Sequence, residues 1–224
     1  GDWSSDVCSS DLEAVIQSID VETIYDVPIL MYMEGLDLVV MKRLGIEDEN
    51  EPDLTHWKNF LKRYKNPKST VTIGLIGKYV ELQDSYKSIL ESFVHAGAAN
   101  EVEVKVVPIH SSHLEEKDMQ EKIANLDGVL VAPGFGERGI EGKINAVKYV
   151  REHQIPFFGI CLGMQMAVIE YARNVLQLTA ANSVEMDADT PHPVISLMDD
   201  QHNIIHKRSE EHTSELQSPM YLVC

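Results

Sequence analysis

The sequence predicts an α/β domain in which helices cover both faces of an open, mostly parallel sheet. From residue 71 to residue 173, short apolar segments alternate with amphipathic ones, a pattern typical of repeated strand–helix units. A tight turn around one Cys follows the last predicted strand. Sheets of this class place their functional groups where the strands end, so this turn is the first candidate for a site.

Each predicted strand is a short apolar run, and each predicted helix carries an apolar stripe. We expect strands at 71–76, 102–109, 128–132 and 155–160, and helices at 85–97, 115–125, 140–153 and 163–173. The first of these helices is expected to end at Gly97, because glycine is common at helix C-termini. The apolar stripe of that helix consists of Tyr86, Ile89, Leu90, Phe93 and Val94.

The residues before this domain form two further segments. Residues 13–46 are largely apolar and include helical spacing over 36–44. Residues 47–69 are rich in charge, Pro and Asn, which indicates a linker, with a short helix-like stretch around Trp57. We therefore expect the α/β domain to occupy residues 70–207.

The two ends of the chain have an unusual origin. The DNA that encodes residues 208–218 (RSEEHTSELQS) has a reverse complement that encodes residues 2–12 (DWSSDVCSSDL). The coding sequences of unrelated protein termini should not be complementary. This DNA resembles a sequencing-library adapter, so the two segments look like translated adapter. Residues 1–12 and 208–224 are accordingly expected to be non-native and are left out of the fold prediction.

Composition excludes several classes of function. The net charge of −17 argues against nucleic acid as a partner. No apolar run is long enough to cross a membrane, so no membrane partner is expected. Cys161 is the one cysteine of residues 13–207, which excludes a disulfide within them and fits a cytoplasmic protein.

Cys161 lies between a predicted strand and a predicted helix, with glycines at 159 and 163. Small residues on both sides let the backbone turn sharply and expose the sulfur at the end of the sheet. The N-terminus of the helix favours a thiolate there. Cys161 is therefore a candidate nucleophile; the alternative is an inert, buried thiol.

The loop at 133–139 (PGFGERG) contains the spacing G-x-G-x-x-G. It could bind a dinucleotide, hold an oxyanion with its backbone N–H groups, or be an ordinary glycine turn. A candidate nucleophile one strand later favours the oxyanion role. Residues 73–78 (IGLIGK) lack the spacing of a phosphate loop and are expected to form a strand and turn.

A thiolate nucleophile also needs a base, and the sequence does not single one out. His113 lies in a polar loop, and none of the histidines after Cys161 has an acid two residues later. The candidates that remain are His110, His113, His192, His202 and His206.

Residues 159–165 (GICLGMQ) resemble the nucleophile elbow of class I glutamine amidotransferases, whose fold is flavodoxin-like. Within that superfamily the chain resembles the CTP synthase family through residues 71–88, 133–142 and 181–185, with further likeness at 24–28 and 51–57. The resemblance covers essentially all of residues 13–207. It implies that residues 13–46 are the tail of a synthetase domain and 70–207 an incomplete amidotransferase domain.

The resemblance also implies site residues. Cys161 would attack the amide of glutamine, while the Leu162 N–H and the Gly134 loop hold the oxyanion. The positions implied to bind substrate are Gly134, Phe135, Leu162, Gly163, Met164, Gln165 and Glu185. No metal site and no cofactor are expected within this chain.

In the family, ammonia from glutamine converts UTP to CTP in a reaction that uses ATP and Mg²⁺. GTP activates the enzyme allosterically, and the usual assembly is a tetramer. The synthetase core and the His and Glu of the catalytic triad have no counterparts in residues 13–207, so we expect a fragment that is inactive or nearly so. Two alternatives are another class I amidotransferase-like hydrolase and a non-catalytic nucleotide-binding module.

Overall fold

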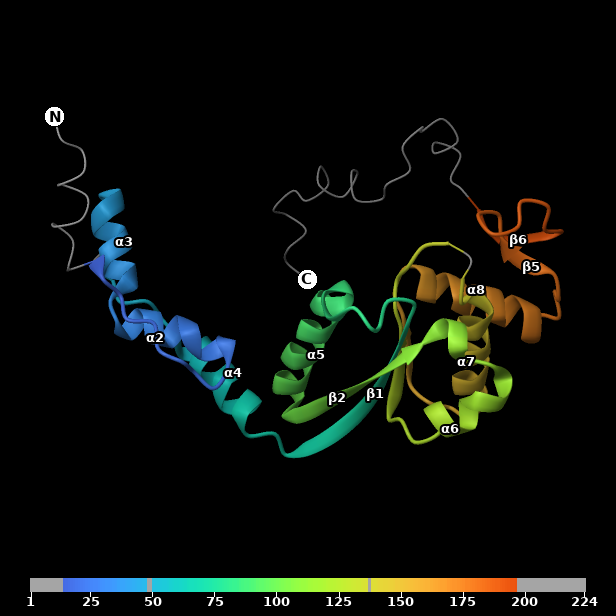
Figure 1. The fold of residues 1–224 in the computed structure, drawn as a ribbon, viewed down its shortest axis with the longest axis horizontal. Helices are drawn as coiled ribbons and strands as arrows, with labels where there is room; N and C mark the ends of the chain where they lie inside the picture. Colours follow the sequence, from blue (N-terminus) through green and yellow to red (C-terminus); the bar gives the residue numbers. More distant parts are fainter. Residues whose placement is uncertain (1–13, 48–49, 137, 197–224) are drawn as a thin grey trace. The chain divides into compact units, whose positions relative to one another are not determined.

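The computed structural model describes residues 14–47, 50–136 and 138–196 (Figure 1). Contacts between residues divide the chain into two compact units. Unit 1 comprises the chain up to residue 72 together with residues 86–106, and unit 2 comprises residues 73–85 and the chain from residue 107. The strands β1 (Ser69–Gly77) and β2 (Val102–His110) each contribute residues to both units.

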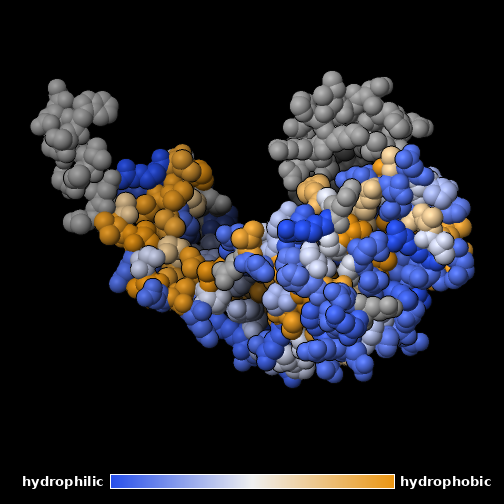
Figure 2. All heavy atoms as spheres, turned by 45° about the vertical axis from the view of Figure 1, so that its right-hand side comes forward, coloured by the Kyte–Doolittle hydropathy of each residue, from blue (hydrophilic) through white to orange (hydrophobic). Residues whose placement is uncertain are grey.

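Unit 1 contains mainly short helices. After the 3-10 turn η2 (Ile24–Asp26), it has α2 (Val27–Met33), α3 (Leu36–Leu44), α4 (Thr55–Lys65) and α5 (Lys87–Asn100). The helix predicted over 36–44 is thus present, and it ends at Gly45, whose φ of 66° is in the left-handed region. Neither α2 nor α3 has a buried residue, and Figure 2 shows apolar side chains gathered on the surface of the N-terminal helices.

An aromatic cluster in unit 1 gives the predicted linker a definite structure. The Tyr25 ring packs edge-on against Phe60 and Tyr64, with centroids 5.2 and 5.4 Å away. The Trp57 Nε1–H donates to the Tyr25 carbonyl at 2.9 Å, and the Tyr25 hydroxyl donates to Glu91. Burial, followed by the hydrogen bond to Glu91, raises the pKa of Tyr25 to about 12. Residues 55–65 are therefore a packed helix within a polar segment.

Helix α5 continues three residues beyond the predicted end at Gly97. Its last residue is Asn100, and Glu101 ends it with a left-handed φ of 57°. A Cβ on Gly97 would lie 2.7 Å from the Val102 carbonyl oxygen. Gly97 is therefore required for the close approach of helix and strand, not for helix termination.

The four-stranded sheet has the order β2-β1-β3-β4. β3 (Gly128–Val131) is parallel to β1, with Ile73 opposite Gly128 and Ile76 opposite Val131. β4 (Phe157–Gly159) is parallel to β3 on the other side. All four predicted strands are present, and the α/β fold with a mostly parallel sheet is confirmed.

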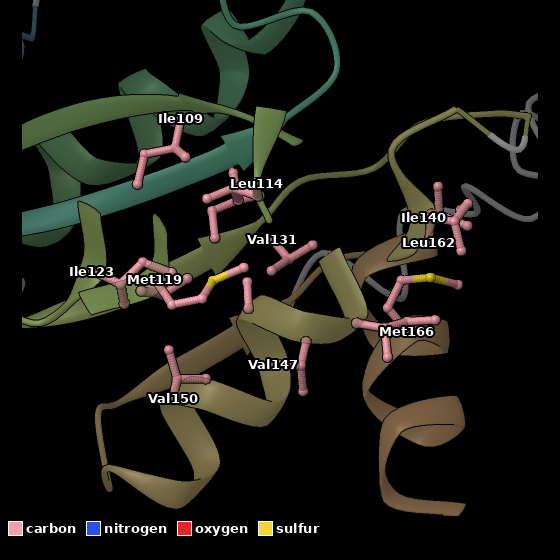
Figure 3. Close-up of a cluster of buried hydrophobic side chains, with 14 of the residues drawn as sticks. Ile109, Leu114, Met119, Ile123, Val131, Ile140, Val147, Val150, Leu162 and Met166 are labelled. Atoms are coloured by element: carbon pink, nitrogen blue, oxygen red, sulfur yellow. The ribbon is translucent and has the colours of Figure 1, made fainter. Parts of the chain in front are cut away.

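Three helices pack within unit 2: α6 (Met119–Ile123), α7 (Ile140–Glu152) and α8 (Leu162–Asn174). The helix predicted over 115–125 is in fact a 3-10 turn, η5 (Glu116–Asp118), followed by the five-residue α6. Two other 3-10 turns are η3 (Gln83–Tyr86) and η4 (Ser111–His113). The buried cluster in Figure 3 joins Val131 of β3 to Val147 of α7 and Met166 of α8.

A second, two-stranded parallel sheet follows α8. It consists of β5 (Ala181–Ser183) and β6 (His192–Ile195), with an irregularity at residues 182–183. The Arg173 Nε–H donates to the Ala181 carbonyl at 2.7 Å and so connects α8 to β5. The sequence did not predict β5 and β6, because ANS and HPVI contain polar residues and a proline and are not apolar runs.

No helix within the described ranges is both long and apolar enough to span a membrane.

Candidate active site at the ends of β3 and β4

Cys161 occupies a sharp turn between β4 and α8. Its backbone has φ 52° and ψ −107°, a combination outside the regions that non-glycine residues ordinarily adopt. The thiol is free and exposed, and helix α8 begins at the next residue. An exposed thiol held by strained backbone at a helix N-terminus fits a nucleophile better than an inert buried cysteine.

Two glycines make this turn possible. A Cβ on Gly159 would lie 2.6 Å from the Gly163 carbonyl carbon, and a Cβ on Gly163 would lie 2.1 Å from the Val131 carbonyl oxygen. Both distances are shorter than any tolerable contact, so the strand and helix can approach this closely only because side chains are missing. The sequence predicted this role for both glycines.

Backbone hydrogen bonds anchor the turn to the sheet. The Ile160 N–H donates to the Val131 carbonyl at 3.0 Å, and the Gly163 N–H donates to the Ile160 carbonyl at 2.8 Å. The Leu162 N–H lies in the first turn of α8, where N–H groups have no partner within the helix. That group is available to an oxyanion formed beside Cys161.

The glycine loop lies next to the turn. It follows β3, where the Ala132 N–H donates to the Ile76 carbonyl at 2.9 Å. A Cβ on Gly134 would lie 3.7 Å from Leu162 Cδ2. The structure therefore brings together the two elements that the sequence predicted as nucleophile and oxyanion loop.

Two lysines that the sequence did not single out bind this loop. Lys143 Nζ donates to the Ala132 carbonyl at 3.2 Å, and Lys78 Nζ donates to the Phe135 carbonyl at 3.3 Å. Lys143 is 1% exposed. Burial and then the charge of Lys78 lower the pKa of Lys143 from 10.5 to about 8, whereas Cys161 acts in the opposite direction.

A signal for Lys143 exists in the sequence. Lys143 falls on the apolar stripe of its helix, three residues after Ile140 and four before Val147, both of which are buried. A lysine at such a position is unusual in a core.

Four other predicted substrate-binding residues are the first four residues of α8. Leu162 and Gly163 are buried, Met164 is half exposed, and Gln165 is partly buried. The Gln165 Oε1 atom is buried and has no hydrogen-bond partner among the described residues. A buried acceptor without a donor is costly, and a donor from a bound substrate would satisfy it. Phe135, on the glycine loop, is 69% exposed.

Glu185 lies after β5, with an exposed side chain and with its N–H donating to Ser183 Oγ at 3.2 Å. Within the described part of the chain, no hydrogen bond or ion pair connects its carboxylate to the turn at Cys161. Its assignment stays a prediction, as do the other assignments of residues to the substrate.

Among the described residues, no hydrogen bond connects His110, His113 or His192 to Cys161. The rings of His110 and His113 stack with centroids 4.5 Å apart, and both line an open pocket of about 430 Å³. His192 is the exposed first residue of β6. His202 and His206 lie outside the described residues. In the ranges that are described, no imidazole is hydrogen-bonded to the Cys161 sulfur.

Comparison with known proteins identifies the family of the chain. Residues 81–220 match the family model described as glutamine amidotransferase class-I. The chain belongs to this family. The match begins within the predicted amidotransferase domain and ends beyond the boundary that the sequence predicts at residue 207.

Several relatives carry the name CTP synthase. The proteins of Christiangramia forsetii and Flavobacterium johnsoniae are 66% and 64% identical over 200 residues. Each alignment covers 89% of this chain and 37% of the relative, so the chain spans a little more than a third of the length of these proteins. The resemblance that the sequence predicts is thereby confirmed.

A solved structure agrees with these relatives. The glutaminase domain of Trypanosoma brucei CTPS with bound acivicin superposes with a TM-score of 0.57 at 38% identity. The match covers 59% of this chain and 52% of that chain.

Proposed function

We propose that the amidotransferase domain of this chain releases ammonia from glutamine through a covalent intermediate on Cys161. The observation that supports this most directly is the strained, exposed turn at Cys161, at the N-terminus of α8 and beside the glycine loop. Family membership supports this class of reaction, and the geometry of the turn supports Cys161 as its nucleophile.

The proposed reaction has two steps. The Cys161 thiolate attacks the side-chain amide carbon of glutamine, forming a C–S bond and an oxyanion. The C–N bond then breaks, and the leaving nitrogen takes up a proton to depart as ammonia, which leaves a glutamyl thioester. Water attacks the thioester carbon, the C–S bond breaks, glutamate is released, and a proton from the water regenerates the thiol.

The oxyanion would accept hydrogen bonds from the Leu162 N–H and from the Gly134 loop. Gln165 would receive a donor from the substrate at its unpaired Oε1. The remaining proposed substrate contacts are Phe135, Gly163, Met164 and Glu185.

For the longer protein, we infer the activity named in its relatives: amination of UTP to CTP with ammonia from this domain, driven by ATP. Residues 13–46 would be the tail of the synthetase domain, since the exposed apolar side chains of α2 and α3 suit an interface. Activation by GTP, tetramer assembly and a cytoplasmic location are also proposed, because the CTP synthase family has these properties.

Within the described ranges, no group of three or more His, Cys, Asp or Glu residues could hold a metal ion. On the resemblance to the CTP synthase family, ATP, Mg²⁺ and UTP are proposed to bind the synthetase domain of the longer protein.

The test is ammonia release from the purified 224-residue chain at saturating glutamine, with Cys161→Ala as control. We expect little or no turnover, because no base is hydrogen-bonded to Cys161 within the described residues and a positioned acid–base group contributes roughly 10²–10⁴-fold. The chain should also fail to make CTP. Cys161-dependent turnover at the rate of an intact glutaminase would contradict this and would indicate a base outside the described residues.

Covalent labelling tests the nucleophile separately. A glutamine-analogue affinity label should modify Cys161 in preference to Cys8 and Cys224. Equal labelling of all three thiols would argue against an organised active site.

A further inference from the structure

Two lysines hold the glycine loop by its carbonyl groups, and the proposed reaction assigns neither of them a role. Lys143, in the first turn of α7, donates from Nζ to the Ala132 carbonyl at 3.2 Å. Lys78, the residue after β1, donates from Nζ to the Phe135 carbonyl at 3.3 Å. The loop is therefore held at two points by ammonium groups from two different parts of the chain.

Each ammonium also lies against a glycine of the loop. A Cβ on Gly134 would lie 3.6 Å from Lys143 Nζ, and a Cβ on Gly136 would lie 3.8 Å from Lys78 Nζ. Lys143 is 1% exposed, although lysine is among the residues that are least often buried. Burial of an ammonium is costly, so its place beside the loop needs an explanation.

The bond to Ala132 limits the direction of the Gly134 N–H group. The peptide bond between Ala132 and Pro133 is rigid, and the proline ring fixes φ of Pro133. The ψ rotation of Pro133 is then the one soft dihedral between the anchored carbonyl and the Gly134 N–H. Lys143 thus holds the chain one rotatable bond away from this N–H group.

The bond to Phe135 has a similar effect on Gly136. In a trans peptide the C=O of one residue and the N–H of the next point in opposite directions, and no cis peptide bond occurs among the described residues. Anchoring the Phe135 carbonyl on Lys78 therefore sets the direction of the Gly136 N–H. Gly136 has a φ of 75°, and as a glycine it could otherwise adopt other conformations readily.

We propose that Lys78 and Lys143 are positioning residues for the glycine loop: their ammonium groups fix the Gly134 and Gly136 N–H groups in the orientation that stabilises the oxyanion. The role rests on the proposed glutaminase function, because the oxyanion forms in that reaction. Donors that are oriented beforehand need no reorganisation while the charge develops. The proposal also explains why an ammonium occupies the apolar stripe of α7.

The first experiment measures backbone motion in the full 224-residue chain labelled with ¹⁵N-glycine. The NMR order parameters of the Gly134 and Gly136 amides should be about 0.8 or higher, as in rigid backbone. Lys143→Met should lower the value for Gly134, and Lys78→Met the value for Gly136, to below about 0.6. A wild-type value below about 0.6 at either glycine would overturn the proposal, and a variant with the wild-type value would overturn the role of that lysine.

The second experiment measures the reaction of Cys161 by mass spectrometry. The ketone oxygen of a chloromethyl ketone analogue of glutamine becomes an oxyanion when the thiolate attacks, whereas iodoacetamide reacts by direct displacement. Relative to its iodoacetamide rate, each Met variant should lose about tenfold in the maximal rate of ketone labelling, at an unchanged half-saturating concentration. A merely structural defect would instead change the half-saturating concentration or the iodoacetamide rate.

Two further variants are controls for this labelling. Lys78→Arg keeps an N–H donor for the Phe135 carbonyl and should restore most of the rate. Lys122→Met removes a lysine bond to a carbonyl outside the loop, that of His113 at 3.0 Å, and should be labelled like the wild type. Wild-type labelling of both Lys78→Met and Lys143→Met, or an equal loss in Lys122→Met, would overturn the proposal.

The order parameters of the wild type require no substitution, so they test the proposal even if a variant fails to fold. They also require no glutamine. Failure of the ketone to label Cys161 in a chain whose loop is rigid would therefore bear on the proposed function. A mobile loop in a chain that is labelled normally would overturn the role of the two lysines.

Discussion

At the scale of single residues, Lys143 links the site to the pH dependence of stability. Its pKa is about 8 in the folded chain and near 10.5 when unfolded. Below pH 8 both states are protonated, and the folded state bears the full cost of the buried charge. Between pH 8 and pH 10.5 the unfolded state binds more protons, so the free energy of unfolding rises with pH.

We therefore expect the free energy of unfolding of the wild type to gain about 3 kcal/mol between pH 8 and pH 10.5, relative to Lys143→Met. Urea unfolding at a series of pH values measures this difference, and subtracting the variant removes other titrations such as that of Tyr25. At pH 7 the variant should be the more stable protein. Parallel curves for the two proteins would contradict the burial of a charged amine.

The close packing of the turn at Cys161 leads to a second prediction about a single residue. Gly163→Ala places a methyl group 2.1 Å from the Val131 carbonyl oxygen, which is backbone of a central strand and cannot move aside. We expect a loss of about 3 kcal/mol or more in the free energy of unfolding, at the upper end of typical overpacking. Gly134→Ala is the matched control, since its Cβ would make only ordinary contacts at 3.6 and 3.7 Å. Equal stabilities of the two variants would contradict the close approach of α8 to β3.

The sequence revealed the residues whose types are distinctive and missed those whose role depends on burial. Cys161, its glycines and the glycine loop could be predicted because few residues tolerate such turns. Lys143 and Lys78 could not be assigned, because their role depends on which carbonyls the fold brings within reach. Gln165 was predicted from the resemblance alone, and the structure adds its unpaired Oε1 atom.

At the scale of elements, an ion pair between the partly exposed Arg151 and the buried Glu170 joins α7 to α8. Glu170 is 1% exposed and accepts hydrogen bonds from Arg151 at 2.8, 3.0 and 3.1 Å. Asn174 donates to the same carboxylate at 3.2 Å. Hydrogen bonding to Glu170 is the main cause of the raised pKa of Arg151.

Arg151→Met should destabilise the chain by about 3 kcal/mol, because it leaves a buried carboxylate with one weak donor. The double variant Arg151→Met with Glu170→Met should recover most of the loss, since apolar pairs of similar volume replace buried ion pairs well. Urea unfolding of both single variants and the double variant gives the coupling. Additive losses would show that the two side chains do not act as a pair.

Elements with strong periodicity were predictable, and short or irregular ones were not. The strands β1 to β4 and the helices α7 and α8 occur within a few residues of their predicted positions, whereas β5 and β6 were not predicted. Helix α6 is shorter than predicted because η5 occupies the start of the segment. Local patterns could not reveal that α5 continues past Gly97, since a glycine at a close approach and a glycine at a helix end look alike in sequence.

At the scale of the whole molecule, the two compact units have different boundaries from the domains that the sequence predicts. Unit 1 combines the N-terminal helices with α5 and the first part of β2, whereas the sequence places α5 and β2 within the amidotransferase domain at 70–207. Composition marks the polar stretch at 47–69, but the aromatic packing around Tyr25 connects η2, α4 and α5 across it. The domain boundaries therefore stay predictions.

The last prediction concerns the two ends of the chain, residues 1–12 and 208–224. If they are translated adapter, deleting both should shift the melting temperature by no more than about 2 °C, which for a chain of this size is less than about 1 kcal/mol. The family match through residue 220 raises the opposite possibility, that residues 208–220 belong to the domain. Calorimetry of the separate deletions decides between the two, with deletion of residues 192–224 as control. That control removes β6 and should lower the melting temperature clearly, because β6 pairs with β5. A loss of similar size on removing 208–224 alone would show that this segment contributes to the fold and that its resemblance to adapter sequence is misleading.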